Sequence, residues 1–225
     1  MDYAVDIEQL VFSYRGPKDV LRIPALAIAK EEKIFLHGPS GSGKTTLLGI
    51  LAGVLRATEG RVTILGQDLA RMSGPRRDAH RGSHIGYIFQ MFNLIPYLNV
   101  FENIILPCRI SPERQRRLNG RSRQDEAKKL AERLGIGPIV NDNVVDLSVG
   151  QQQRVAAARA LLGAPELIIA DEPTSSLDED HREGFLQLLF DQCREIGSTL
   201  IFVSHDRRMM PLFDRAVSLA EINRV

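Results

Sequence analysis

Short apolar runs that end at glycine or polar residues mark the strand-like parts of this chain. Residues Lys33–His37 form such a run and stop directly before a glycine, as a buried parallel strand does. Two similar runs, at 167–170 and Thr199–Val203, flank a stretch at 182–193 with helical spacing. Alternation of strands and helices predicts an α/β fold whose parallel sheet is covered on both faces.

The rest of the hydrophobic pattern divides the chain into an N-terminal β-prone part and a helical middle. Runs at 7–14, 25–29 and 60–65 read as strands, and the last is expected to stop in a turn at 66–68. Leucine spacing predicts a helix at 45–55. From 91 to 165 the chain is rich in Arg and Glu with helical periodicity, which predicts a helical lobe containing a surface helix; that helix carries Glu126, Leu130 and Leu134.

Composition and charge narrow the function classes. The chain has 225 residues and a formal net charge of +1, so there is no global electrostatic reason to expect nucleic-acid binding. We interpret the basic runs at 76–77 and 114–123 as solvated faces. Cys108 and Cys193 lack the spacing of metal ligands, and no stretch reaches the ~18–20 apolar residues of a membrane span. Any membrane association is therefore expected to come through a partner.

A glycine-rich segment follows the strand at Lys33–His37 and precedes the predicted helix. Its spacing is that of a P-loop, in which backbone N–H groups and the helix dipole bind phosphate oxygens. Lys44 is expected to bridge the β- and γ-phosphates of a nucleotide, and the Thr45 hydroxyl to bind Mg²⁺. The competing interpretation, a Gly/Ser-rich turn that caps a helix, does not need the strand before it. The proposed nucleotide contacts are Gly38, Pro39, Ser40, Gly41, Ser42, Gly43, Lys44, Thr45 and Thr46.

Two carboxylates follow the apolar run at 167–170. Open α/β sheets bind ligands at the C-terminal ends of their strands, which is where Asp171 and Glu172 stand. Asp171 is expected to hold Mg²⁺ through water, and Glu172 to act as the general base on the attacking water. An isolated acidic pair would more often only cap a sheet, but the P-loop favours the catalytic interpretation.

The segment Leu147-Ser148-Val149-Gly150-Gln151, some twenty residues before Asp171, resembles the signature motif of the ATP-binding-cassette ATPases. The resemblance covers essentially the whole chain. It implies a single domain, 1–225, with a P-loop NTPase core containing a parallel sheet, an N-terminal antiparallel β subdomain and an inserted helical lobe. The core is expected at 1–90 and 166–225, and the helical lobe at 91–165.

The same resemblance assigns roles to further residues. Tyr14 matches the aromatic residue that stacks on adenine, although such a residue alone would more often pack in a core. Gln90 matches the glutamine that reaches Mg²⁺ and the water, and His205 the histidine that contacts the γ-phosphate; a lone histidine at a strand end is usually structural. Asp178 falls in the loop that crosses the dimer interface. Ser148, Gly150 and Gln151 are expected to cover the ATP on a second subunit.

One position departs from the family, since the motif usually has glycine where this chain has Val149. A β-branched residue does not readily adopt a positive φ, so the position must have ordinary backbone angles. Gly150, whose backbone would approach phosphate most closely, is retained. We therefore predict that the valine is tolerated.

These features together predict an ATP-hydrolysing subunit that uses ATP and Mg²⁺, forms a homodimer around two ATP molecules and drives a separate integral membrane permease. It would lie on the cytoplasmic face of the bacterial inner membrane, held there by the permease. Motifs at 89–96 and 102–107 are most similar to the branch serving lipoprotein release and macrolide export. Residues 91–107 are where the family docks its permease, and Phe92, Leu94, Ile95 and Leu98 either line that contact or are buried. The alternatives are a soluble ATPase acting on nucleic acid or ribosomes and a regulator that does not hydrolyse ATP.

Overall fold

The computed structural model describes residues 2–14, 16, 18–175 and 179–225. Its backbone falls into two units, Met1–Arg81 with Thr199–Val225, here unit 1, and Gly82–Ser198, here unit 2. Each unit has its own buried residues and its own strands, so each is described by itself. The predicted boundaries of the helical lobe, 91–165, stay a prediction.

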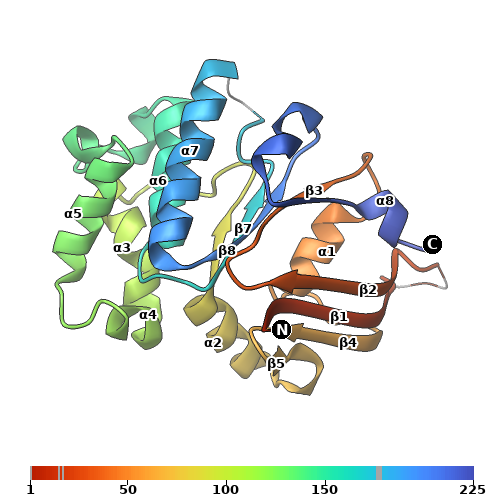
Figure 1. Cartoon of the computed structure of the whole chain (residues 1–225). Coiled ribbons are helices and arrows are strands. Elements are labelled where there is room, and N and C mark those ends of the chain that lie inside the picture. The colour runs from red at the N-terminus through yellow and green to blue at the C-terminus, as the bar shows by residue number, and fades with distance from the viewer. Residues whose placement is uncertain (1, 15, 17, 176–178) are drawn as a thin grey trace. The chain divides into compact units, whose positions relative to one another are not determined.

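An antiparallel sheet forms the N-terminal part of unit 1, in agreement with the prediction. Strand β1 (Tyr3–Phe12) lies between β2 (Leu21–Ala29) and β4 (Glu59–Ile64), and the three lie side by side in Figure 1. Ile7 stands opposite Leu26 of β2 and Val62 of β4, and all three are buried. Burial of one face fixes the register, because a shift by one residue would expose this whole set.

The chain turns one residue earlier after β4 than predicted. The turn lies at 65–66, and the next residues, Gln67–Asp68, form a short strand β5 that pairs with β4. Asp68 then caps the 3₁₀ helix η1 (Leu69–Arg71) by accepting a hydrogen bond from Ala70 N. The sequence contains the turn residues, but strand pairing moves the turn to the left-handed pair Leu65 and Gly66.

The parallel strands of unit 1 are β3 (Lys33–His37), β8 (Thr199–Val203) and β9 (Arg215–Ser218), with β3 paired to both of the others. β3 and β8 are nearly continuous apolar runs because a parallel strand inside a sheet is buried on both faces, whereas β9, at the sheet edge, buries only Val217. The remaining helical segments that lie wholly in unit 1 are α1 (Lys44–Leu51), η4 (Arg207–Leu212) and α8 (Leu219–Ile222), while α2 (Gly74–His84) crosses into unit 2.

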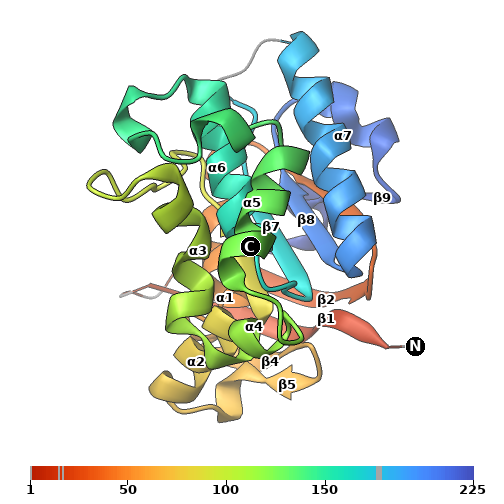
Figure 2. The same cartoon turned by 90° about the vertical axis from the view of Figure 1, so that its left-hand side faces the viewer.

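Unit 2 pairs two parallel strands, β6 (Ile85–Ile88) and β7 (Leu167–Asp171), and adds a set of helices. Figure 2 shows α5 in front of α6 with α3 alongside, and these three helices contact one another. The helical segments are α3 (Val100–Ile110), α4 (Pro112–Arg116), α5 (Arg123–Arg133), η2 (Gly137–Ile139), η3 (Val144–Asp146), α6 (Val149–Leu161) and α7 (Glu179–Ile196).

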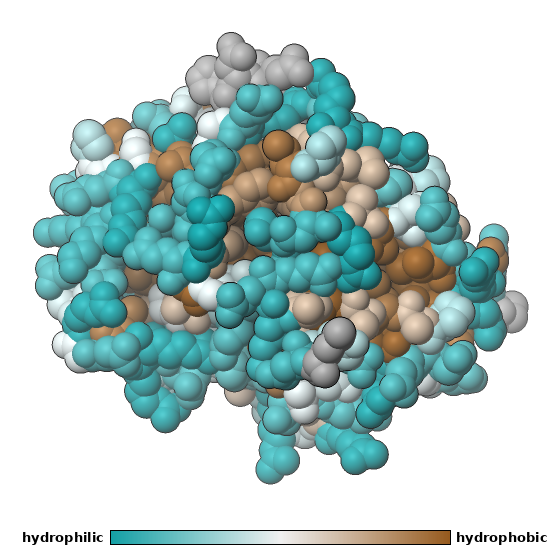
Figure 3. Space-filling model, in the orientation of Figure 1, coloured by the Kyte–Doolittle hydropathy of each residue, from teal (hydrophilic) through white to brown (hydrophobic). Residues whose placement is uncertain are grey.

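The predicted surface helix is confirmed as α5. It buries Ala127, Leu130 and Ala131 on one face, and its other positions are charged or polar. The face that carries it in Figure 3 is largely hydrophilic. In the described part of the chain, no helix combines the length and hydropathy that crossing a membrane requires.

The interpretation of residues 114–123 as a solvated face is wrong for Arg114, which is only 2% exposed. Its guanidinium donates to Gly82 O, Ala160 O and Leu162 O at 2.9 Å each and to Ile85 O at 2.5 Å. Burial lowers the pKa of Arg114 to about 10, so the side chain stays charged at neutral pH. The sequence pattern could not reveal this, because the acceptors are backbone carbonyls from distant segments.

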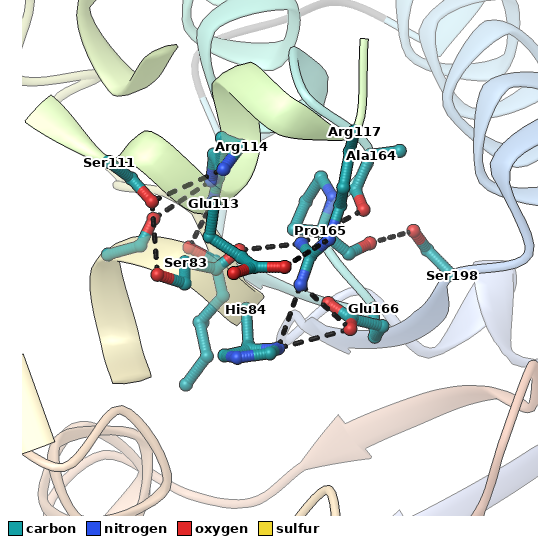
Figure 4. A network of polar contacts seen from close by, with 12 residues as sticks. Ser83, His84, Ser111, Glu113, Arg114, Arg117, Ala164, Pro165, Glu166 and Ser198 are labelled. Carbon is teal, nitrogen blue, oxygen red and sulfur yellow. Dashed lines mark hydrogen bonds and ion pairs between the residues drawn. The ribbon is translucent and has the colours of Figure 1, made fainter. Parts of the chain in front are cut away.

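Arg117 is also mostly buried and contacts the same segments. It donates to Ser83 O at 2.7 Å and to the Glu166 carboxylate at 2.9 Å, and it reaches down between Ala164 and the pair His84–Glu166 in Figure 4. Burial by itself raises the pKa of Glu166, but the hydrogen bond with His84 and the charges of His84 and Arg117 outweigh it, so that pKa lies below its usual value. The two arginines therefore fasten α4 to the ends of α2 and α6.

Candidate functional site

The predicted phosphate loop has the backbone that phosphate binding needs. Gly41 and Gly43 have φ of 77° and 97°, and a Cβ on Gly43 would lie 2.7 Å from the Leu21 side chain. Lys44 Nζ donates to Gly38 O at 2.9 Å and to Pro39 O at 3.0 Å, which holds the charge within the loop. The buried Ser42 hydroxyl has no hydrogen-bond partner among the described residues. This donor-rich, positively charged loop at the start of α1 fits a triphosphate.

Tyr14 and His205 lie near the loop within unit 1. The Tyr14 hydroxyl is 3.2 Å from Thr46 Oγ1, and its exposed ring packs edge-on against Phe12. β3 and β8 are parallel and pair Leu36 with Val203. Gly38 and His205, which follow these strands, therefore leave the sheet at the same end. His205 is exposed there. The structure thus brings both predicted residues to the side of unit 1 that carries the phosphate loop.

The two predicted carboxylates, Asp171 and Glu172, lie in unit 2 at the C-terminal end of β7. Ile88 pairs with Ala170, which places Gln90 level with Glu172 just beyond the two strands. Asp171 accepts a hydrogen bond from the Tyr87 hydroxyl of β6, and burial together with that carboxylate raises the pKa of Tyr87. Tyr87 therefore orients Asp171, a link that the sequence offered no signal for.

Glu172 has an unusual backbone. Its φ is 46°, a left-handed conformation that costs a non-glycine residue about 1 kcal/mol or more. The next residue but one, Thr174, is 2% exposed, and Pro173 O accepts a hydrogen bond from the buried Gln153 side chain at 2.8 Å. The surrounding contacts hold the carboxylate in a conformation that the isolated chain would avoid, as is common at catalytic positions.

The signature segment begins α6. Ser148 is the N-cap, its hydroxyl accepts from Gln151 N at 3.3 Å, and Gln151 Oε1 accepts from Ser148 N at 2.9 Å, which completes a capping box. The N–H groups of Val149 and Gly150 fall in the first turn, where a helix supplies no acceptor. Ser148 is exposed, so this helix N-terminus is open to an anion from outside the unit.

Val149 takes the first helical position and is not among the described residues with positive φ. Its side chain is 46% exposed and lies at the surface. The prediction that this position has ordinary backbone angles is confirmed, because the first turn of a helix does not require glycine.

Replacement of Val149 by glycine is accordingly expected to change the ATPase rate less than about tenfold, since the N-cap and the backbone N–H groups remain. Steady-state phosphate release by the assembled transporter checks this. A tenfold or larger gain for Val149→Gly would mean that the valine obstructs the lid. Val145→Gly, which changes another exposed valine of unit 2, serves as the matched control.

Arg159 of α6 is a further residue that sequence reasoning missed. It donates to Phe92 O at 2.6 Å and Asn93 O at 2.7 Å, directly after Gln90, and both of these acceptor residues have positive φ. Burial lowers the pKa of Arg159. The sequence did contain one signal for this role, which is a charged residue within the alanine-rich part of the helix. Arg159 and Gln153 thus tie the signature helix to the loops that follow β6 and β7.

Phe92 is only 6% exposed, so of its two expected roles it has the buried one and does not line a docking contact. Asp178 lies outside the described residues.

Within the described ranges no cluster of three or more His, Cys, Asp or Glu side chains has the geometry of a metal site. The expected Mg²⁺ ligands, Thr45, Gln90 and Asp171, are a hydroxyl, an amide and one carboxylate. Oxygen donors of this kind suit Mg²⁺, which commonly binds through substrate phosphates and water as well.

Comparison with known proteins decides the family. The family model described as "ABC transporter" matches residues 21–175. The chain belongs to this family. It is 42% identical to the uncharacterized ABC transporter ATP-binding protein YbbA of Escherichia coli K12, over 86% of this chain and 83% of that one. It is 36% identical to the lipoprotein-releasing system ATP-binding protein LolD of Porphyromonas gingivalis, over 92% of each chain.

Solved structures agree. The dimeric bacterial ABC transporter cassette MJ0796 matches with a TM-score of 0.83 and 32% identity, covering 95% of this chain and 93% of that one. A post-hydrolysis dimer of the same cassette with ADP and Pi matches with a TM-score of 0.80 and 34% identity over the same shares. The predicted P-loop ATPase fold is confirmed, and the chain is an ATP-binding, ATP-hydrolysing cassette. The matches support this function over an ATPase acting on nucleic acid or ribosomes.

Proposed function

We propose that two copies of this cassette close on two ATP molecules and that each copy completes the other's site. The observation that carries the proposal is the open N-terminus of α6. Ser148 and the first-turn N–H groups form an anion-binding site that lies at the surface of unit 2. The relative MJ0796 was solved as a dimer. The phosphates on one subunit's Lys44 would thus meet the partner's Ser148 and Gly150.

Within each site we assign one role to each side chain. The P-loop amides and Lys44 bind the β- and γ-phosphates, and Tyr14 stacks on the base, supported by its contact with Thr46. Glu172 takes the proton from the attacking water, while Gln90 and His205 orient the water and the γ-phosphate. Thr45, Gln90 and Asp171 would hold Mg²⁺, which neutralises charge that develops on the phosphates.

We further propose that the cassette drives a separate membrane permease, at the cytoplasmic face of the bacterial inner membrane. The surface that supports this lies after β6, where Met91 and Tyr97 are 80% and 84% exposed. The buried Asn103 donates to Ile95 O, Leu98 O and Asn99 O and so holds this loop in place. Two large apolar side chains on a held loop are suited to a protein contact. Similarity to LolD favours lipoprotein release or export.

Co-purification in detergent checks the permease assignment. The tagged cassette, expressed in its own host, is expected to retain a protein with several membrane spans. Met91→Asp with Tyr97→Asp should reduce that recovery about tenfold or more, since two charges would be buried at the interface. The control is Ile110→Asp, an apolar residue that is also largely exposed but lies at the end of α3. Equal recovery with both variants, or no membrane protein with the unaltered cassette, contradicts the proposal.

A further inference from the structure

A cavity of about 340 Å³ opens in unit 2 between α5, α7 and the segment that joins α6 to β7. Leu161 and Leu162 line it at the C-terminal end of α6. Helix α6 has 13 residues, so Ser148 at its other end is about 20 Å away at 1.5 Å per residue. The cavity is therefore separate from the signature end of the same helix, and its residues have no part in the nucleotide site described above.

Charge is unevenly distributed around this cavity. Four cationic side chains line it, Arg117, Arg121, Lys129 and Arg133, against the two carboxylates of Glu126 and Glu195. Two of them belong to the run 114–123 and two to the exposed side of α5, where sequence alone indicated only solvated charge. The lining residues carry a surplus of two positive charges, which falls to one when Glu166, the partner of Arg117, is counted as well.

The existing ion pairs at the cavity leave room for a ligand. Glu126 is shared between Arg121 at 3.1 Å and Lys129 at 3.4 Å, and Glu195 pairs with Arg133 at 2.6 Å. Arg117 pairs at 2.9 Å with Glu166, which stands behind the wall. Exposed pairs of this kind contribute little to stability, so Arg121 and Lys129 can turn from Glu126 to a ligand at little cost.

The floor of the cavity is held in a fixed conformation. Gly163 and Ala164 have φ of 77° and 47°, and a left-handed alanine persists only where its surroundings impose it. A Cβ on Gly163 would lie 2.7 Å from the Cβ of Arg114, so a larger residue does not fit there. Arg117 Nη1 donates to Ala164 O at 3.4 Å. Gln192, 8% exposed, adds a buried amide to the wall. The cations thus surround a preformed surface with polar groups at its base.

We propose that this cavity binds a phosphate-bearing ligand. The excess of cations favours an anion, and arginine forks form short, charge-assisted hydrogen bonds with phosphate oxygens. The volume falls within the range of small-ligand sites. Free phosphate and a phosphate-bearing lipid headgroup share this chemistry, and both are available to a cassette bound at a membrane.

Titration of ¹⁵N-labelled cassette with inorganic phosphate, in saturating ADP to occupy the P-loop, tests the proposal by NMR. The amides of Gly163 and Ala164 report the cavity, and those of Gly41 and Gly43 report the P-loop. Shifts at Gly163 and Ala164 are expected to saturate with a Kd on the order of 1 mM. Lys129→Gln should weaken this binding about fivefold, and Glu126→Gln, which removes the competing carboxylate, should tighten it.

Lys128→Gln is the matched control, because this neighbouring exposed lysine of α5 does not line the cavity. Equal effects of Lys128→Gln and Lys129→Gln, or shifts that never saturate, overturn the proposal. Co-sedimentation with vesicles of phosphatidylcholine alone or with phosphatidic acid identifies the source. Binding to the phosphatidic acid vesicles that Lys129→Gln weakens and Lys128→Gln does not assigns the site to a headgroup; Lys129-dependent NMR shifts without vesicle binding assign it to free phosphate.

Discussion

Glu172→Gln is expected to reduce ATP turnover by about 10²–10⁴-fold, the usual contribution of a general base. The amide keeps the shape of the carboxylate but cannot accept the proton of the attacking water. Binding of ATP should be retained, because the P-loop, Lys44 and the lid at Ser148 are untouched. Phosphate release at saturating MgATP measures the loss, and fluorescent-nucleotide titration measures the retained affinity.

The same variant also tests the shared site. If hydrolysis normally reopens the pair of cassettes, Glu172→Gln should accumulate as an ATP-bound dimer in size-exclusion chromatography, while the unaltered cassette elutes as a monomer. Glu183→Gln, an exposed glutamate on α7, provides the matched control and should leave turnover unchanged. Undiminished turnover with Glu172→Gln would remove this residue from the mechanism, and loss of turnover with no dimer would contradict closure on two ATP molecules.

Arg114→Met is expected to lower the free energy of unfolding by about 3–5 kcal/mol. The methionine fills part of the space but leaves the carbonyls of Gly82, Ile85, Ala160 and Leu162 without their donor in a buried site. Each orphaned carbonyl costs a share of its hydration, and water enters only by opening the packing around α4. The midpoint of urea denaturation, followed by circular dichroism, measures the change.

Two further variants separate the hydrogen bonds from the charge. Arg114→Lys keeps the charge but brings a single ammonium to carbonyls that the planar guanidinium reaches from several nitrogens, so an intermediate loss is expected. Arg116→Met removes an arginine of the same helix that is 73% exposed and should stay within about 0.5 kcal/mol of the unaltered protein. If Arg114→Met matched Arg116→Met, the buried network would have no role in stability.

Much of the fold could be predicted because its strands are local apolar runs. The residues of β3, β7 and β8 are buried on both faces, and this burial makes each of them a continuous hydrophobic segment. The end of α6 also follows from local residue types, because Gly163 has the left-handed φ that ends a helix and Pro165 follows it. The turn after β4 was misplaced because β5 pairs with β4 through backbone hydrogen bonds. Such pairing does not depend on residue type, so the sequence did not predict it.

The sequence by itself determined which chemistry the chain carries, since the P-loop, the acidic pair and the signature segment depend on residue types at short, fixed spacings. Only the tertiary structure decided how those segments are held. Arg159 and Gln153 join α6 to the loops beside Gln90 and Glu172, and Arg114 is buried. The cations of α5 and of the segment after α4 line one cavity. These contacts join side chains to backbone atoms or to charges far away along the chain. A pattern of residue types shows neither kind of partner. The charge of Arg114 therefore predicted a solvated side chain, whereas in the fold it is hydrogen-bonded to buried carbonyls.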